Sequence, residues 1–490
     1  MLFNSLDFLI FLPAAFCIYW ASPVKIRAYV LLALSYYFYF NLSGAFTLIL
    51  ICVTALTWGA SFLISGAESP KLKKGILAAA LCLSLSFLLF FKYFNFFSEA
   101  IADALNFTGM KVQPLTLALF LPAGISFYTF QAVGYLIDVA KGKIPPEKNP
   151  AIYALFVSFF PQVLSGPIGR ADSLLPQLKS HKALDTEGAS YGLRLMLLGF
   201  FKKLIVADAL GRYVDIIFQD VYSYFGLTFI AAAIMYTFQI YCDFSGYSEI
   251  ALGTARLFNI ELMTNFRSPY CSRSIREFWS RWHISLSTWF RDYVYIPLGG
   301  SRVAVWRTNL NLLITFLVSG LWHGASWTFI FWGGLHGIFQ ITENAIGRIR
   351  GPEKQRDKKE EKWNLIGVAK WLLTLVLVSI AWIFFRANSL PDALYVVTHL
   401  HNGVVLHFAN AWKKMMVDMT LTPFGIVKLL TALVAIMVYD FFSLKRDLLK
   451  KLGTLKLPIR WAVYTAFTVL IIVVRLHNAG GRQTFIYFNF

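Results

Sequence analysis

Residues 319–337 read SGLWHGASWTFIFWGGLHG, and this stretch joins two apolar runs at 309–321 and 328–345. Two apolar runs separated by so short a break predict a pair of neighbouring membrane helices. The glycines of the stretch allow the helices to approach closely, and its tryptophans supply flat walls. His323 lies in the break, where an ionisable side chain is costly to desolvate and is therefore a functional candidate by default.

The composition extends this interpretation to the whole chain. Of its 490 residues, 57% are hydrophobic and 14% are charged, and the mean hydropathy is +0.59. An ordinary soluble domain has roughly 25% charged residues, so most of this chain must lie where charge is expensive. Aromatic residues make up 17%, and Trp and Tyr collect at membrane interfaces. We therefore expect a polytopic membrane protein of the all-α class.

About twelve apolar segments along the chain predict the number of membrane helices. They fall at 5–20, 28–41, 45–65, 76–98, 115–139, 189–209, 226–243, 309–321, 328–345, 367–385, 425–443 and 461–476. Several are shorter than the ~20 residues of a perpendicular span, so we expect roughly 11–13 transmembrane helices with re-entrant or amphipathic helices beside them. A further short stretch at 151–164 is expected to enter and leave the membrane on one face.

Basic residues set the expected orientation. The net charge is +19, and the strongly basic loops are 66–75, 141–148, 170–182, 346–362 and 445–460. All of them lie on one face of the predicted topology, which the positive-inside rule makes cytoplasmic. We expect a multi-pass protein of the cell inner membrane, surrounded by lipid, with both termini outside. Nucleic acid is not an expected partner, because no basic arm stands outside the apolar runs.

The region 261–300 breaks the apolar pattern, because arginines and aromatic residues are mixed in it. Irregular polar backbone at membrane depth is tolerated where protein buries it or where it lines a watery cavity. We expect short re-entrant helices that floor an internal cavity; the alternative is an interfacial helix with snorkelling arginines. The chain is predicted to be one membrane domain, with N-terminal helices at 1–140, a core at 141–345 that holds His323, and C-terminal helices at 346–490.

Three histidines are candidates for chemistry within the apolar part of the chain. Histidine has an ordinary pKa of about 6.5, which suits proton transfer near neutral pH. His323 is a candidate general base, and the alternative is a histidine that hydrogen-bonds between helices as packing. His283, in SRWHISLS, is a second candidate, whereas His336 fits packing better than chemistry.

A polar run, QIYCDFSGYSEIALG at 239–253, carries too many hydrogen-bonding groups to face lipid. These groups should line the protein interior, and Asp243 or Glu249 could pair with arginines of the following region. Lys202 and Lys203 stand inside an apolar segment and need partners or an anionic ligand such as a phosphate. The polar groups and the histidine together suit either a transfer enzyme or a transporter.

Metal and nucleotide chemistry find no support in the sequence. His399, His401 and His407 crowd an expected outer loop, but no carboxylate cluster accompanies them. The five cysteines form no CxxC pair. No GxSxG elbow, Walker A loop, HExxH motif or dinucleotide fingerprint is present. We expect no metal and no permanently bound cofactor.

Seven motifs together resemble one protein family. They are FWSRWHISLSTWFRDYVYIPLGG (278–300), WHGASW (322–327), QIYCDFSGYSEIALG (239–253), GPIGR (166–170), FKKLIVAD (201–208), AWIFFRA (381–387) and the terminal FIYFNF (485–490). The chain resembles the membrane-bound O-acyltransferase family over nearly its whole length, in particular the bacterial branch that acetylates alginate, peptidoglycan and cellulose. Glu249 and Asn489 depart from the family pattern, and neither touches the candidate chemistry.

The resemblance implies a ring of helices around a thinned central channel open from both faces. It implies that His323 is the essential histidine and that His283 is the second family histidine. It further implies an acyltransferase that takes acetyl from a cytoplasmic thioester, acetyl-CoA or another acyl thioester, and passes it to an extracytoplasmic polysaccharide. An alginate-like polymer is expected first, and a periplasmic serine-hydrolase-like partner is expected to receive the acetyl group before the polymer does.

Substrate contacts are predicted around these histidines. The candidates are Trp322, Trp327, Arg281, Asp243 and Ser326. The tryptophans and nearby backbone N–H groups are expected to donate to the thioester oxyanion. Alternatives are transfer of D-alanine or another acyl group to peptidoglycan or teichoic acid, a transporter without chemistry, and a scaffold that only recruits a synthesis complex.

Overall fold

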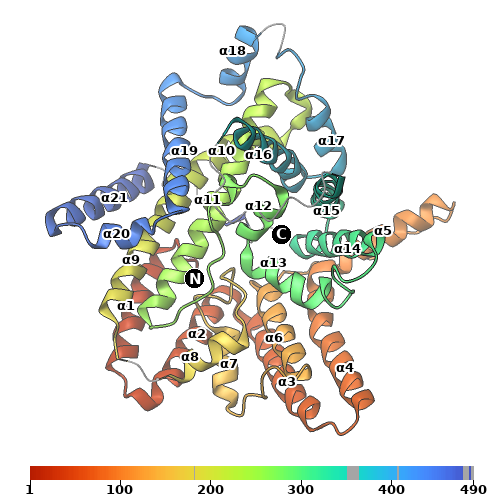
Figure 1. The fold of residues 1–490 in the computed structure, drawn as a ribbon, viewed down its shortest axis with the longest axis vertical. Helices are drawn as coiled ribbons and strands as arrows, with labels where there is room; N and C mark the ends of the chain where they lie inside the picture. Colours follow the sequence, from red (N-terminus) through yellow and green to blue (C-terminus); the bar gives the residue numbers. More distant parts are fainter. Residues whose placement is uncertain (181–182, 350–363, 405–407, 478–484, 487–490) are drawn as a thin grey trace. The chain divides into compact units, whose positions relative to one another are not determined.

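The computed structural model describes residues 1–180, 183–349, 364–404, 408–477 and 485–486, and these form helices and no strands (Figure 1). The all-α prediction is therefore confirmed. Three sequence predictions reach beyond the described residues: most of the basic loop at 346–362, His407, and the last four residues of the terminal motif with Asn489.

Two compact units make up the chain. The first unit comprises Met1–Met196 with Tyr247–Thr264, and the second comprises Leu197–Gly246 with Asn265–Phe490. The helices α9 and α11 each contribute residues to both units. The remaining helices of the first unit are α1 (Leu6–Ala21), α2 (Arg27–Ser43), α3 (Thr47–Gly66), α4 (Pro70–Leu88), α5 (Phe94–Phe107), α6 (Ile125–Ala140), α7 (Pro150–Ser158) and α8 (Ala171–Lys179).

The second unit contains the aromatic and histidine-bearing motifs. The two shared helices are α9 (Thr186–Phe200) and α11 (Leu227–Leu257). The other helices are α10 (Asp208–Gln219), α12 (Ile275–Arg281), α13 (Ile284–Phe290), α14 (Val305–His323), α15 (Trp327–Ile349), α16 (Leu365–Arg386), α17 (Leu390–Thr398), α18 (Phe408–Asp418), α19 (Pro423–Ser443), α20 (Leu448–Gly453) and α21 (Leu457–His477).

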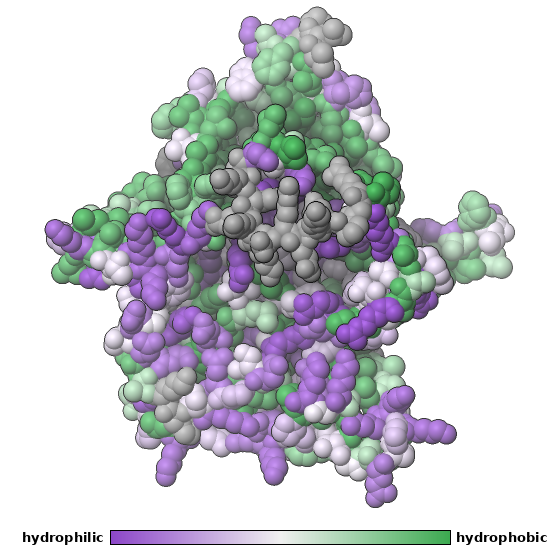
Figure 2. All heavy atoms as spheres, in the orientation of Figure 1, coloured by the Kyte–Doolittle hydropathy of each residue, from purple (hydrophilic) through white to green (hydrophobic). Residues whose placement is uncertain are grey.

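Six helical stretches among the described residues are long and apolar enough to cross a membrane. They are Val24–Gly66, Pro70–Phe107, Leu227–Leu257, Leu365–Arg386, Pro423–Ser443 and Leu457–Arg475. Only 22% of the apolar window of α19 is buried within the protein, and the surface over this helix is strongly hydrophobic in Figure 2. Apolar side chains exposed along a spanning helix face lipid. The chain is thus a multi-pass membrane protein.

The helix expected at 115–139 begins later than predicted, at Ile125. The preceding segment is irregular, and two asparagines of α5 hold its backbone: Asn95 exchanges two hydrogen bonds with Leu117, and Asn106 exchanges two with Val112. Gly124 then starts α6 with a φ of +71°, in the left-handed region that favours glycine. Side-chain pairing of this kind satisfies backbone groups without a helix, so apolar composition alone gave the wrong boundary.

The helix α11 continues through the polar run at 239–253 without interruption. Asp243 and Ser245 are buried, as the interior placement of this run predicts. Gly246 allows close packing, because a Cβ there would lie 2.7 Å from the carbonyl oxygen of Gly199. A long helix can therefore carry polar groups in a membrane protein when neighbouring backbone, instead of lipid, covers them.

The region 261–300 folds into short helical pieces, as predicted. The α-helices α12 and α13 follow one another, preceded by a 3-10 turn at Pro269–Cys271 and followed by a π-helical turn at Arg291–Tyr295. Their short lengths follow from left-handed residues that break the helical path, Ser268 and His283 among them. The re-entrant position of these pieces in the bilayer remains a prediction.

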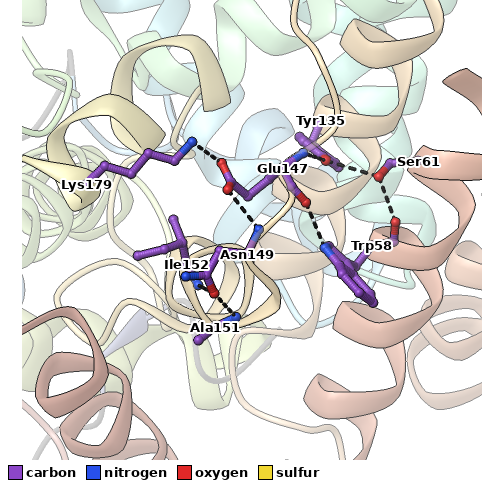
Figure 3. Close-up of polar contacts among 8 residues, drawn as sticks. All are labelled: Trp58, Ser61, Tyr135, Glu147, Asn149, Ala151, Ile152 and Lys179. Atoms are coloured by element: carbon purple, nitrogen blue, oxygen red, sulfur yellow. Dashed lines mark hydrogen bonds and ion pairs between the residues drawn. The ribbon is translucent and has the colours of Figure 1, made fainter. Parts of the chain in front are cut away.

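A polar network anchors the loop that leads into α7 (Figure 3). Glu147 is buried, forms an ion pair with Lys179, and donates its backbone N–H to the Tyr135 hydroxyl over 2.8 Å. Its carbonyl accepts from the Trp58 indole over 2.8 Å. Asn149 accepts from two backbone N–H groups of the first turn of α7, which is the ordinary capping arrangement. The loop at 141–148 is therefore tied to α3, α6 and α8.

Candidate active site

The helices α14 and α15 form a closely packed hairpin around the WHGASW motif. A Cβ at Gly320 would lie 2.2 Å from the carbonyl oxygen of Phe329, and one at Gly333 would lie 2.2 Å from that of Phe316. No side chain fits at such distances, so the helix backbones touch directly at both glycines. This contact confirms the close approach that the glycines predict.

His323 is the last residue of α14 and is 3% exposed. Aromatic rings surround its imidazole, with ring centroids of Trp322 and Trp332 at 5.0 Å and of Phe385 at 5.4 Å, all edge-on. The carboxyl end of a helix favours positive charge, which suits a ring that takes up a proton. The sequence motif thus places an imidazole at a helix end, inside an aromatic cluster.

His283 lies between α12 and α13, and its ring centroid is 6.5 Å from that of His323. It is fully buried, and the ring of Phe244 packs edge-on against it at 4.6 Å. Its backbone has a φ of +43° and a ψ of +55°. Residues other than glycine are uncommon in this left-handed region and concentrate at functional sites, where the surrounding structure holds them.

Asn265 fixes the tautomer of His283. Its side-chain oxygen lies 3.0 Å from Nδ1 of His283 and also accepts the Ser285 hydroxyl over 2.8 Å. An amide oxygen can only accept, so Nδ1 of His283 carries the proton and Nε2 carries a lone pair. His283 lies outside the six candidate spans, and burial lowers the pKa of its ring to about 3. The ring is therefore neutral at any physiological pH.

The predicted contacts nearest to His323 in sequence differ in exposure. Trp322 is buried, with its ring 6.1 Å from that of His283 and 5.0 Å from that of His323. Trp327 begins α15 and is 56% exposed. Ser326 is half-buried, and its hydroxyl lies 3.1 Å from that of Thr328. Among these residues the structure brings Trp322 together with both histidines.

Arg281 and Asp243 are engaged in ion pairs. Arg281 ends α12 and lies 2.6 Å from the carboxylate of Glu277 on the same helix. Asp243 pairs with Lys203, where the sequence led us to expect an arginine, and its second oxygen accepts the backbone N–H of Ile486 over 2.9 Å. Both remain predicted substrate contacts.

The two adjacent lysines of the π-helical turn at Phe201–Ala207 are buried and engage different groups. Lys203 lies between two carboxylates, that of Asp208 at 2.8 Å and that of Asp243. Lys202 lies over the ring of Tyr241 at 5.4 Å. Buried lysines require such partners. Of the two alternatives that the sequence left open, partners within the protein or an anionic ligand, the structure shows partners within the protein.

Sequence reasoning missed Asn265, Trp332 and Phe385. Asn265 meets His283 only because the chain reverses between them, with the backbone N–H of Ile284 donating to the Asn265 carbonyl over 2.9 Å. Phe385 belongs to the AWIFFRA motif, which indicated the family resemblance but did not predict a contact with His323. In the part of the chain that the structure describes, no three His, Cys, Asp or Glu side chains gather as a metal site requires.

The geometry places two buried imidazoles side by side in a membrane protein, and comparisons with known proteins identify its family. A model of the MBOAT, membrane-bound O-acyltransferase family matches residues 75–385. A protein of Pseudomonas aeruginosa named "Probable alginate O-acetylase AlgI" is 38% identical over 396 residues, which are 80% of this chain and 73% of that protein. The chain belongs to the membrane-bound O-acyltransferase family, and it is an acyltransferase.

Two further relatives have names that specify other polymers, and one of these names also specifies another acyl group. A "Peptidoglycan O-acetyltransferase" of Helicobacter pylori is 35% identical over 445 residues, 83% of this chain and 81% of that protein. A "Teichoic acid D-alanyltransferase" of Streptococcus thermophilus is 31% identical over 284 residues, 54% of this chain and 68% of that protein. The similarity to the acetyltransferases therefore extends over more of the chain.

Proposed function

We propose that the chain is an O-acetyltransferase of the inner membrane. It takes acetyl from a cytoplasmic thioester, acetyl-CoA in the first instance, and passes it toward an extracytoplasmic polysaccharide of the alginate type through a periplasmic serine-hydrolase-like partner. The observation that carries the proposal is the pair of buried imidazoles, His283 and His323, with ring centroids 6.5 Å apart. Similarity to the acetylases over 80–83% of the chain supports acetyl as the transferred group.

The chemistry follows from a base beside a buried indole donor. His323 takes the proton of the acceptor hydroxyl while that oxygen attacks the thioester carbonyl, so that a C–O bond forms. The indole N–H of Trp322, which is buried where Trp327 is exposed, donates to the oxyanion. Collapse of the tetrahedral intermediate breaks the C–S bond, and the proton passes from His323 to the leaving thiolate. The ester and the free thiol balance the reaction.

His283 has a different role, because the proton on its Nδ1 is donated to the side-chain oxygen of Asn265. The lone pair on Nε2 accepts a hydrogen bond from the acceptor hydroxyl or from an amide of the thioester donor. A ring whose pKa lies at about 3 does not exchange protons near neutral pH. We therefore assign His283 to orientation of the substrate and His323 to proton transfer.

A donor comparison tests this function against D-alanyl transfer. Proteoliposomes that contain the chain receive radiolabelled acetyl-CoA or a radiolabelled D-alanyl thioester of a carrier protein, each with the hydrolase-like partner. The proposal predicts label on the partner from acetyl-CoA and none from the D-alanyl thioester. Label from the D-alanyl thioester alone would replace acetyl with D-alanine, and label from neither, with solute flux across the membrane, would favour the transporter.

A further inference from the structure

His336 lies on α15, one helical turn after Trp332, and is fully buried. The indole N–H of Trp279 on α12 donates to its Nδ1 over 3.2 Å. We infer that His336 is a positioning residue, which couples α12 to α15 through this hydrogen bond and so sets the separation of His283 and His323. The inference rests on the proposed function, because that separation matters only if the two imidazoles act together.

The donor defines the state of the His336 ring. An indole N–H can only donate, so Nδ1 accepts and the proton of the neutral ring is on Nε2. Within the described residues Nε2 has no hydrogen-bond partner. The imidazole lies among aromatic rings, with the ring centroids of Phe278 at 6.1 Å and of Phe316 at 6.3 Å, both stacked. Among the described residues, the Trp279 indole is thus the one hydrogen-bond partner of the ring. An unpaired Nε2–H among aromatic rings has a cost that packing alone does not explain.

The bond joins α12, which ends two residues before His283, to α15, which packs against the helix that ends at His323. Trp279 lies on α12, four residues before His283, which follows the end of that helix. On α15, Trp332 packs against His336 at 5.1 Å and against His323 at 5.0 Å, with its ring at 89° to the His323 ring. A shift of α12 along α15 would therefore move His283 relative to His323.

A chain of aromatic contacts also links the segment before His283 to α15. Trp282, the residue before His283, packs against Trp382 at 5.0 Å, and Trp382 stacks on Trp332 at 5.5 Å. Ring packing tolerates a wider range of geometries than a hydrogen bond does, because a hydrogen bond weakens steeply as its angle departs from linear. The Trp279–His336 bond therefore specifies the register of α12 on α15 more narrowly than these ring contacts do.

Four variants test the inference in the transfer assay with acetyl-CoA: His336→Phe, Trp279→Phe, the double variant, and His336→Asn. Loss of the partner that orients a metal-bound histidine typically lowers activity about 10–100-fold. By analogy, we expect each Phe variant to lose at least ~10-fold in kcat with KM little changed. The double variant should be no worse than either single change, because both ends of one interaction are removed. His336→Asn keeps an acceptor near the position of Nδ1 and should recover most of the rate.

Trp58→Phe is the matched control, because it removes an indole hydrogen bond of similar length in the other unit, that to the carbonyl of Glu147 (Figure 3). It should lower the melting temperature and leave kcat unchanged. Wild-type kcat in His336→Phe would overturn the inference, as would equal losses in His336→Asn and His336→Phe. His323→Ala is measured in parallel: if it is active, the proposed function fails, and if it is inactive while His336→Phe is active, only the inference about His336 fails.

Discussion

The side-chain oxygen of Asn265 lies 3.0 Å from Nδ1 of His283, and this contact decides which ring nitrogen carries the proton. The amide can only accept, so His283 presents a lone pair on Nε2. Its ring lies beside that of His323, at the end of another helix. One imidazole therefore has a fixed tautomer, and the other belongs to the last residue of α14.

Replacement of Asn265 by alanine should lower kcat about 10–100-fold, by analogy with losing the partner that orients a metal-bound histidine. Acetyl transfer from acetyl-CoA measures it. Asn149→Ala is the matched control, because Asn149 caps α7 and its loss should cost about 1 kcal/mol of stability without a change in kcat. Equal kcat in both variants would remove Asn265 from the site.

Replacement of Asn265 by aspartate should change the pH profile. Burial holds the pKa of the His283 ring at about 3, and a carboxylate beside Nδ1 raises that pKa because it stabilises the imidazolium. The rate of the variant should then fall as pH is lowered through the raised pKa, at pH values where the wild type is unaffected. Identical acid limbs in the two profiles would contradict the role given to the Nε2 lone pair.

Gly333→Ala should separate α14 from α15. The added Cβ would lie 2.2 Å from the carbonyl oxygen of Phe316, a backbone atom that cannot rotate away. We expect a loss of about 1–3 kcal/mol of stability, typical of overpacking, together with a loss of transfer activity. Gly334→Ala is the control on the next residue, because its Cβ meets only the end of Leu317 at 3.5 Å. Thermal unfolding in detergent separates the two, and equal midpoints would contradict the packing of the hairpin.

Asp243→Asn should lower the stability of the protein more than it changes the KM for the substrate. It leaves Lys203 buried with one carboxylate, that of Asp208, and loss of one partner of a buried pair costs about 3–5 kcal/mol. Glu261→Gln removes the partner of an exposed pair with Arg256 and should cost less than about 1 kcal/mol. An unchanged melting temperature with a raised KM for acetyl-CoA would instead establish Asp243 as a substrate contact.

The local pattern of the sequence was enough to predict that the chain is helical and that α14 and α15 pack closely beside His323. Apolar runs, glycines and the motif around residue 323 specify α14, α15 and their contact, because these features act between neighbours in the chain. The late start of α6 was missed, since Asn95 and Asn106 hold the preceding backbone from another helix.

Contacts between distant segments could not be predicted. The partner of Asp243 was expected to be an arginine of the following region, but Lys203 comes from a π-helical turn that packs against α11. Asn265 likewise contacts His283 because the chain reverses between them, and no local sequence pattern predicts that reversal. Charge and hydrogen-bonding capacity indicate that a buried group needs a partner, and only the fold selects which one.

The most direct test of the central claim is polymer-bound acetyl ester in cells that carry His323→Ala, compared with wild type and with the deletion strain at equal membrane abundance. His283→Ala is measured beside it. The account predicts that acetyl content in the His323→Ala cells falls to the level of the deletion strain, because the base that activates the acceptor hydroxyl is gone. Unchanged acetylation would show that His323 is a packing residue and that the chain does not transfer acetyl groups through this site.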